Sequence, residues 1–316
     1  MVVKSGRALH FVFKVADRAE TTKFYLSVLG MKALRHEEFQ EGCDAACNGP
    51  YDNRWSKTMV GYGPEDTHFV VELTYNYNVH KYEQGNDFQG ITIRSREAIE
   101  RAKAAGWPIK EENGVHVVEA PGGYKYFLLN EPQPTDKGPL QPEALGDRRP
   151  AALKLNFVTV AHSGSDPVEK VTLSSSNLAR TLAYWNEILG LKIFSKENDK
   201  ALLAFAESQA KLEFKDIGKP VDHATAYGRI AYSVPKAEQP VIDKKIKETG
   251  NKILTPLITL DTPGKASVTV IILADPDEHE ICFVDDESFR VLSEVDPKAE
   301  ASLYKYIEKD EKRRKV

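Results

Sequence analysis

The chain of 316 residues is 41% hydrophobic and 28% charged, which is ordinary for a globular protein and long enough for two domains. Its formal net charge of -4 gives no electrostatic reason to expect a nucleic-acid partner, and no apolar run is long enough to span a membrane. The first residues lack the apolar stretch of a secretory signal, so we expect a cytoplasmic location, with a mitochondrial one as the alternative.

The first predicted element is a strand over residues 9–15. Side chains alternate along it, so Phe11 lies on an apolar core face and His10 lies on the opposite, mixed face. Asp17 is well placed to cap a following helix, and the apolar stripe of that helix stops at Gly30. The pattern predicts a strand, a turn and a helix of about three turns.

The same strand-and-helix pattern recurs along the chain. Leu-Gly-Met-Lys at residues 29–32 matches Leu-Gly-Leu-Lys at 189–192, and weaker copies begin near residues 90 and 228. Two or three short predicted strands follow each helix. This self-similarity is typical of an internal repeat, so we predict four modules of strand, helix and antiparallel strands.

A long loop is predicted between the early strands, over residues 37–56, and we expect it near the mouth of any site that the sheet forms. Cys43 and Cys47 lie in this loop, and Cys282 lies in the last predicted strand. Three cysteines do not suggest a disulfide framework, so we expect free thiols. A metal or redox role for the loop pair is the alternative to two ordinary thiols.

One carboxylate interrupts an apolar strand. Glu72 stands in the middle of residues 69–75, which otherwise suit burial. An isolated buried charge is very costly, so this carboxylate needs a partner.

Proline, glycine and charged residues crowd the middle of the chain and predict a linker there. We therefore expect four segments: an N-terminal domain of modules one and two at 5–131, a linker at 132–151, a C-terminal domain of modules three and four at 152–290, and a charged helical tail at 291–316. Residues 152–160 are apolar enough for a strand, and Asp275-Pro276-Asp277 predicts a simple turn before the last strand. We expect the tail to end in solvent.

Residues 8–35 and 61–85 resemble the first module of glyoxalase I, of the vicinal oxygen chelate superfamily. The resemblance implies an α+β fold of four βαβββ modules that form two glyoxalase-like domains with cupped mixed sheets. In that superfamily two modules form a cup, and each gives a metal one ligand from its first strand and one from its last. The ion polarises a carbonyl and stabilises an enediolate while a carboxylate removes the adjacent proton.

Three of the eight implied ligand positions match the family pattern. In module order, the positions hold His10 and Glu72, Gly90 and Phe127, Lys170 and Glu213, and Arg229 and Cys282. If modules one and two share a cup, His10 and Glu72 face two groups that cannot ligate, and cations bind Glu213 in the other cup. If module one pairs with module four, His10, Glu72 and Cys282 converge on one divalent ion, zinc or nickel. Arg229 then lies beside them and bonds Glu72 or repels the ion.

Each candidate site also has an alternative in which its residues serve only the structure. His10 and Glu72 can be a hydrogen-bonded pair, and Cys282 can be a buried core thiol. Lys170, Glu213 and Arg229 can form an anion-binding pocket or a structural ion pair. The resemblance also implies glutathione contacts, at Lys14 and Asn76 in the first half and, without matching residues, at Ser174 and Ile217 in the second.

Three functions follow as alternatives. The first is a glyoxalase-fold protein with a degenerate metal site that binds a small glutathione-like or anionic metabolite without glyoxalase I turnover. The second is a metal-dependent lyase or isomerase similar to lactoylglutathione lyase, with Glu72 as its catalytic carboxylate. The third is a protein-interaction scaffold. Four modules can complete two cups within one chain, so a monomer and a homodimer both stay open.

Overall fold

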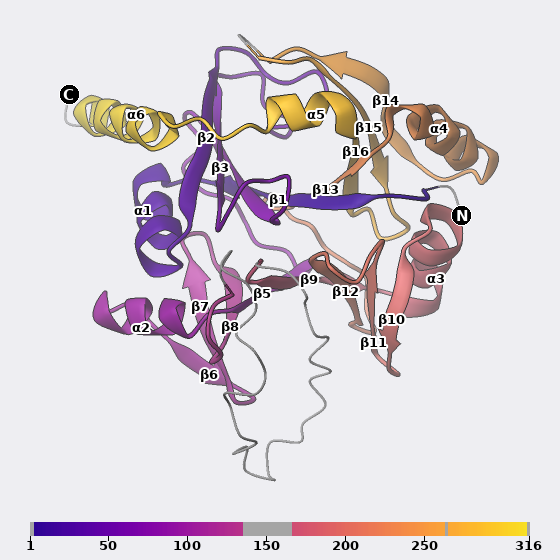
Figure 1. The fold of residues 1–316 in the computed structure, drawn as a ribbon, viewed down its shortest axis with the longest axis horizontal. Helices are drawn as coiled ribbons and strands as arrows, with labels where there is room; N and C mark the ends of the chain where they lie inside the picture. Colours follow the sequence, from indigo (N-terminus) through magenta and orange to yellow (C-terminus); the bar gives the residue numbers. More distant parts are fainter. Residues whose placement is uncertain (1–2, 135–165, 263–264, 315–316) are drawn as a thin grey trace.

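The computed structural model describes residues 3–134, 166–262 and 265–314. It contains two eight-stranded mixed sheets with helices, in which the order of one strand, a helix and three further strands occurs four times (Figure 1). The α+β class predicted from the sequence is confirmed. Within these residues, no helix is long and apolar enough to cross a membrane.

The first two modules occupy the chain up to residue 129. Module one consists of β1 (Arg7–Val15), α1 (Arg18–Lys23), a π-helical segment (Phe24–Val28), β2 (Lys32–Phe39), β3 (Trp55–Gly61) and β4 (Val70–Asn76). Module two consists of β5 (Phe88–Arg94), α2 (Arg96–Ala104), β6 (Lys110–Glu112), β7 (Val115–Ala120) and β8 (Tyr124–Leu129).

The other two modules begin at residue 168. Module three consists of β9 (Val168–Ser175), α3 (Leu178–Leu182), a π-helical segment (Ala183–Leu189), β10 (Lys192–Lys196), β11 (Lys200–Ala204) and β12 (Lys211–Asp216). Module four consists of β13 (Arg229–Val234), a short 3₁₀ turn (Lys236–Glu238), α4 (Gln239–Glu248), β14 (Ile253–Leu260), β15 (Val268–Ala274) and β16 (Glu280–Asp285). Helices α5 (Asp286–Leu292) and α6 (Ala299–Arg314) follow.

Module one shares a sheet with module four, and module two shares the other with module three. The strand orders are β14-β15-β16-β13-β1-β4-β3-β2 and β10-β11-β12-β9-β5-β8-β7-β6. First strands meet in antiparallel fashion at each centre, β1 with β13 and β5 with β9. Each sheet therefore contains strands from both halves of the chain. Neither predicted domain, 5–131 or 152–290, forms a sheet of its own. The observed pairing is the second of the two considered from the sequence.

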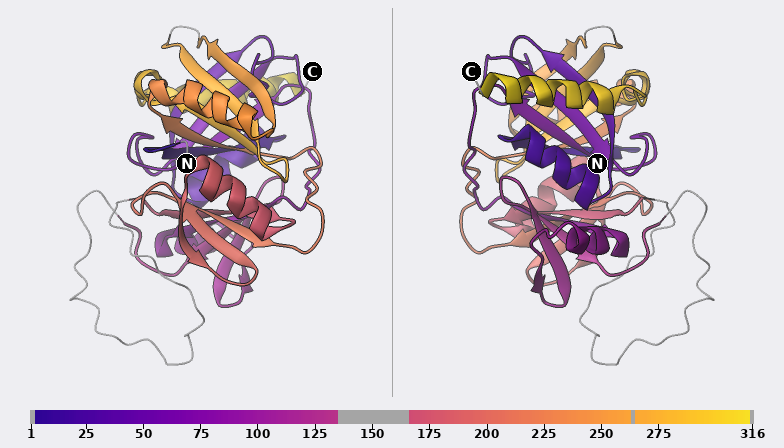
Figure 2. Two further views of the ribbon diagram at one scale, coloured as in Figure 1. Left: turned by 90° about the vertical axis from the view of Figure 1, so that its right-hand side faces the viewer. Right: turned by 90° about the vertical axis from the view of Figure 1, so that its left-hand side faces the viewer.

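The apolar faces of the two sheets pack against each other. Alternate residues of the central strands, such as Phe13 of β1, Ile91 of β5, Leu173 of β9 and Ile230 of β13, belong to one buried core that both sheets share. Figure 2 shows modules one and four, in indigo and orange, above modules two and three, in magenta and salmon. We name the opposite, outward faces cup A (β1, β4, β13, β16) and cup B (β5, β8, β9, β12).

Two predictions about the first half need correction. The long loop is shorter than expected, residues 40–54, because β2 and β3 extend into the predicted range. Cys43 and Cys47 in this loop form a disulfide with a Cα–Cα distance of 5.4 Å, so the expectation of free thiols is wrong for this pair. The tight turn between them brings their Cα atoms within the distance that a disulfide between the two side chains can span. Cys282 is free.

The charged tail is helical, as predicted, but it packs on the protein. Helix α6 buries Leu303 and Ile307 against Ala33 of β2. Arg18 reaches the same helix, donating to the Tyr306 carbonyl at 3.2 Å and pairing with Asp310. The strand predicted at 152–160 lies outside the described residues.

Candidate functional site

The four implied ligand positions of modules one and four all lie in cup A. Strands β1 and β4 run parallel with Val12 opposite Glu72, and β13 and β16 run parallel with Ala231 opposite Cys282. This register brings His10, Glu72 and Cys282 to the same face of one sheet, as the pairing of modules one and four predicts.

His10 and Glu72 lie close together in cup A. His10 Nε2 lies 3.5 Å from a Glu72 carboxylate oxygen, a spacing that suits two ligands of one ion. His10 Nδ1 lies 2.6 Å from Glu65, and Arg35 holds the other Glu65 oxygen at 3.2 Å. Burial opposes ionisation of Glu65, but His10 and Arg35 outweigh it and hold the pKa of that carboxyl below its usual value. A carboxylate behind a ligating imidazole is a common supporting arrangement.

Cys282 is the third ligand that the sequence suggests for this face. Burial raises the pKa of the Cys282 thiol to about 11 despite the nearby Arg229. Cys282 also belongs to none of the groups of three convergent ligand atoms found among the described residues. Among the described residues, His10 and Glu72 are thus two neighbouring candidate ligands, fewer than the three protein ligands of a catalytic zinc site.

Arg229 does not bond Glu72, contrary to one of the sequence-based expectations. Its Nε and one terminal nitrogen lie 2.8 and 2.7 Å from Glu280, which is directly opposite on β16. Its terminal nitrogens also donate to the carbonyls of Ala45 and Ala46 at 3.1 and 3.2 Å. The guanidinium therefore fastens the loop 40–54 to the sheet.

Cup A is filled by the protein's own chain. Ala45 of the loop is fully buried there, together with Phe289 and Leu292 of α5. They pack with Leu9 and Val284 from the sheet itself. The ring of Phe289 lies 6.2 Å from that of His10, so this apolar cluster borders the imidazole.

Lys14 and Asn76, the predicted glutathione contacts, make internal bonds. Lys14 is buried, donates to the Tyr227 carbonyl at 2.7 Å and lies 3.2 Å from the centre of the Tyr227 ring. Burial lowers the pKa of Lys14 to about 7. Asn76 is fully buried and donates to the Asn48 carbonyl and the Tyr82 hydroxyl. Neither side chain lines the cavity described next.

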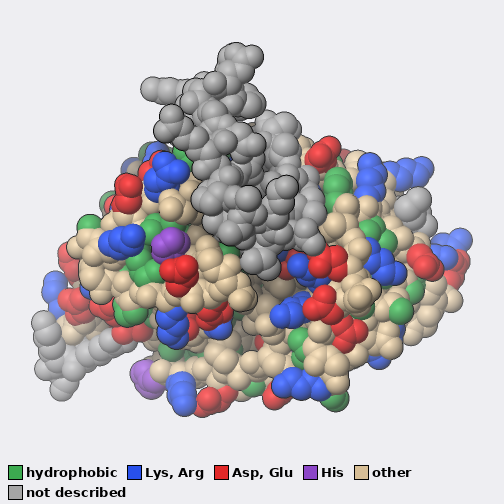
Figure 3. All heavy atoms as spheres, turned by 90° about the horizontal axis from the view of Figure 1, so that it is seen from below, with side chains coloured by type: hydrophobic (Ala, Val, Ile, Leu, Met, Phe, Trp, Pro, Cys, Tyr) green, Lys and Arg blue, Asp and Glu red, His purple; other side chains and the backbone are tan. Residues whose placement is uncertain are grey.

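Cup B contains a cavity of about 320 Å³. Its lining residues are Gln89, Thr92, Val115, Phe127, Leu129, Glu169, Lys170, Thr172, Ser195, Glu197, Asp199, Lys200, Leu202, Lys211, Glu213 and Lys215. Lysine and acidic side chains are intermixed on this face of the molecule (Figure 3). The volume is in the range of small-molecule sites.

Two family ligand positions in cup B have been exchanged for a glycine and an aromatic ring. Gly90 has a φ of +149°, and a Cβ added there would lie 2.4 Å from the ring of Phe127. The ring thus occupies the space that a histidine at position 90 would need. Neither residue can ligate a metal, so this side of the cup provides an apolar wall instead.

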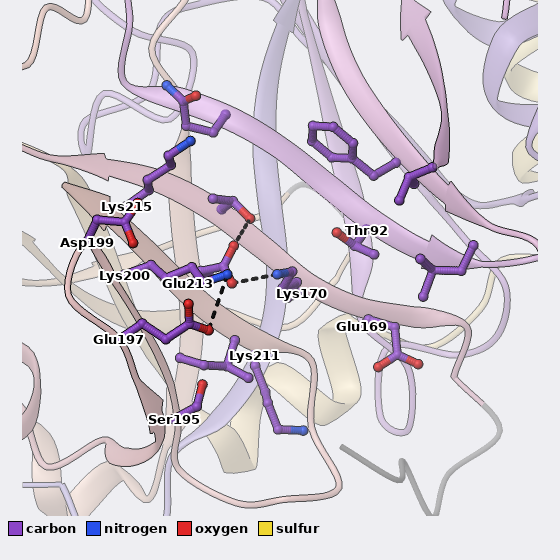
Figure 4. Close-up of a pocket in the computed structure, with 16 residues that line it drawn as sticks. Thr92, Glu169, Lys170, Ser195, Glu197, Asp199, Lys200, Lys211, Glu213 and Lys215 are labelled. Carbon is purple, nitrogen blue, oxygen red and sulfur yellow. Dashed lines mark hydrogen bonds and ion pairs between the residues drawn. The ribbon is translucent and has the colours of Figure 1, made fainter. Parts of the chain in front are cut away.

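The other two positions hold an ion pair. Lys170 Nζ lies 2.5 Å from one Glu213 oxygen, and Thr172 donates to the other at 3.0 Å. Figure 4 shows both interactions at the floor of the cavity. Lys170 and Glu213 therefore lie together as predicted, whereas Arg229 lies in cup A, so the predicted three-residue anion pocket does not form.

Sequence reasoning missed the remaining charges of cup B. Lys211 and Lys215 flank Glu213 at alternate positions of β12 and all three line the cavity. That alternation of like residues on one face of a strand is visible in the sequence and is the signal that identifies them. Lys200 comes from the neighbouring strand β11 and pairs with Glu197 at 3.3 Å.

Four modules of this order, paired into two cupped mixed sheets, define the glyoxalase I fold class. The solved glyoxalase I of Zea mays superposes with a TM-score of 0.65 at 24% identity, over 92% of this chain and 96% of that one. Family models described as glyoxalase domain-containing protein 4, N-terminal, and glyoxalase domain-containing protein 4-like, C-terminal domain, match residues 90–130 and 177–292.

Two full-length relatives complete the comparison. The chain is 52% identical to glyoxalase domain-containing protein 4 of Mus musculus, over 96% of this chain and 93% of that protein. It is 44% identical to a Caenorhabditis briggsae protein named Glyoxalase 1, over 97% and 98%. The chain therefore belongs to the glyoxalase domain-containing protein 4 family.

Proposed function

We propose that this protein binds a small charged metabolite, glutathione-like or anionic, in cup B, and that it does so without the metal-dependent turnover of glyoxalase I. The observation that carries the proposal is the cavity of cup B, which lies where this fold class places its ligands but has Gly90, Phe127 and Lys170 at three of its four metal positions. The protein retains the space for a ligand and has replaced the metal ligands around it.

The charges of the cavity favour a ligand with both signs. Four lysines and four carboxylates line it, beside an apolar wall that includes Phe127 and Leu202. A purely anionic ligand would meet the carboxylates, whereas a peptide-like molecule with carboxylate and ammonium groups can pair with both kinds of side chain. Both cups are completed within one chain, so binding needs no second copy of the protein.

Titration calorimetry with glutathione and with an S-alkyl glutathione tests this proposal. We expect saturable binding of at least one of them, weakened several-fold by Lys215→Glu, because the variant reverses a charge at the cavity. Lys219→Glu makes the same change at an exposed lysine outside the cavity and should leave binding unaltered. Absence of binding, or equal weakening in both variants, contradicts the proposal.

A second candidate is a lactoylglutathione lyase-like activity, which the name Glyoxalase 1 of the nematode relative favours. It requires His10 and Glu72 to work with the apolar cluster displaced from cup A. Isomerisation of the methylglyoxal–glutathione hemithioacetal is measured with purified protein, with and without added zinc or nickel. Robust turnover that is lost in Glu72→Gln would replace the first proposal with this one.

A further inference from the structure

A cluster of two histidines and one aspartate lies at the junction between the two sheets. Asp87 precedes β5, His223 lies in the connection between β12 and β13, and His279 lies in the turn before β16. One ligand atom from each residue lies within 4.8 Å of the other two. It is the one such group found within the described ranges 3–134, 166–262 and 265–314.

The hydrogen bonds of both imidazoles set their tautomers. His223 Nε2 lies 2.7 Å from the Asp277 carbonyl oxygen, and His279 Nε2 lies 2.7 Å from the Ser174 carbonyl oxygen. A carbonyl oxygen can only accept, so both Nε2 atoms carry hydrogen. The Nδ1 atoms are therefore the ones left to face an ion, and an ion at His223 replaces the proton that its Nδ1 shares with Asp87 at 2.9 Å. Histidines that ligate metals commonly donate their other nitrogen to a backbone carbonyl in this way.

Asp87 supplies a carboxylate to the same cluster. Its side chain is buried, and one oxygen lies 2.9 Å from His223 Nδ1. The two imidazole rings are nearly perpendicular, at 85°, with centres 5.1 Å apart. The ring of Phe214 lies 6.1 Å from that of His279 and gives the cluster an apolar neighbour.

The cluster lies where two segments of the chain connect the two sheets. The segments that cross from one sheet to the other, between β4 and β5 and between β12 and β13, run side by side (Figure 2), and Asn86 donates to the Asp222 carbonyl at 2.7 Å. Asp87 lies in the first crossing and His223 in the second, while His279 bonds from the sheet of cup A to Ser174 in the sheet of cup B. An ion held here would fasten both crossings and both sheets at one point.

We propose that Asp87, His223 and His279 form a structural site for a zinc-class divalent ion that fastens the two sheets together. Two imidazoles and one carboxylate suit zinc, cobalt or nickel better than magnesium or calcium, which prefer oxygen ligands. Ligand atoms around tetrahedral zinc lie roughly 3.3 Å apart. The three ligand atoms here lie within 4.8 Å of one another, so each distance between them must shorten by about 1.5 Å or less to hold an ion.

The test uses full-length protein without a histidine tag, stripped of metal by a chelator and titrated with Co²⁺ and Zn²⁺. We expect one ion per chain, the visible absorption bands of tetrahedral Co²⁺, and a rise in melting temperature on adding zinc. His223→Gln, His279→Gln and the near-isosteric Asp87→Asn should each weaken binding at least about tenfold, since even supporting residues of metal sites have effects of that size.

Matched controls separate this site from the others. His80→Gln removes an exposed histidine and should change nothing, and the double variant His10→Gln, Cys282→Ser should leave binding intact. Binding that survives His223→Gln combined with His279→Gln, or that is lost with His10, overturns the proposal. Absence of uptake also overturns it and leaves a protonated His223 held by Asp87. Melting curves of the metal-free variants identify any that fail to fold. If the histidine variants fail to fold, the effect of Asp87→Asn on metal binding decides between the two outcomes.

Discussion

Cup A and cup B differ in the residues at their ligand positions and in the space in front of them. Cup A retains His10 and Glu72 at 3.5 Å but is filled by loop 40–54 and helix α5. Cup B retains a cavity of about 320 Å³ but has Gly90 and Phe127 where ligands would stand. Cup A is packed with apolar side chains of the chain itself, whereas the cavity of cup B is large enough for a small molecule.

The difference also shows how each cup neutralises its charges. In cup A, Arg229 is nearly buried and its hydrogen bonds go to Glu280 and to the carbonyls of Ala45 and Ala46. The side-chain exposures are 10% and 19% for Arg229 and Glu280, and 21% and 14% for Lys170 and Glu213 in cup B, so the main difference lies in the two loop carbonyls that Arg229 also binds. The same kind of ion pair is therefore part of the packing in one cup and part of a cavity floor in the other.

The largest effect is expected when the filling of cup A is released. Arg229→Ala leaves Glu280 without its cation and two loop carbonyls without their donor, so we expect the free energy of unfolding to fall by about 3 kcal/mol. Urea denaturation measures it, with the exposed Lys103→Ala as control. A loss below about 1 kcal/mol would mean that Arg229 does not fasten the loop and that cup A can open.

The next effect concerns the replaced ligands of cup B. Gly90→Ala places a methyl group in a left-handed conformation and 2.4 Å from the Phe127 ring, so we expect a loss of about 2 kcal/mol. In the double variant Gly90→Ala, Phe127→Ala the collision is gone, and the combined loss should be smaller than the sum of the single losses by at least about 0.5 kcal/mol. Additive losses would show that the two replacements are independent.

Much of the fold was predictable from the sequence because it depends on local patterns. The alternation in residues 9–15 and the helix that ends at Gly30 are set by side-chain periodicity and backbone preference, and both occur as expected. The choice between the two module pairings was not predictable. It depends on which apolar strand edges meet, β1 with β13 rather than with β5, and these edges carry similar residues.

The candidate site was predictable only in part. The positions of His10 and Glu72 follow from the family pattern, but the loop that covers them and the bond from Arg229 to Glu280 depend on tertiary packing. Asp87 and His223 lie far apart in sequence, and no spacing rule relates them. Asp277 was interpreted as part of a simple turn, although its carbonyl fixes His223.

A pH profile distinguishes the buried Lys14 of strand β1 from the exposed Lys215 of cup B. The pKa of Lys14 is about 7 in the folded protein and about 10.4 in the unfolded chain. Above pH 7 the unfolded state therefore holds more protons, and stability rises with pH by at most about 1.4 kcal/mol per unit until the unfolded pKa is reached. Below pH 7 both states are protonated and this contribution is constant.

Lys14→Met should remove that rise. The free energies of unfolding of the variant and the unmodified protein are measured by denaturation from pH 6 to pH 9.5. Their difference should be constant below pH 7, and above pH 7 the unmodified protein should gain stability relative to the variant. Lys215→Met, at an exposed lysine of cup B, provides the control for replacing a lysine by methionine. A flat difference for Lys14→Met would mean that this lysine is solvated and that the contact with Tyr227 is loose.

The smallest effect is expected at the floor of cup B. Lys170→Met removes a cation from Glu213, but water can reach the partly exposed carboxylate and Thr172 still donates to it, so the loss should be about 1 kcal/mol or less. Arg229→Ala removes a cation from the corresponding cup A and should cost about three times as much. Denaturation of the two variants side by side measures this ratio. Equal losses would show that cup B is as tightly packed as cup A, and the difference between a filled cup and an open one would then disappear.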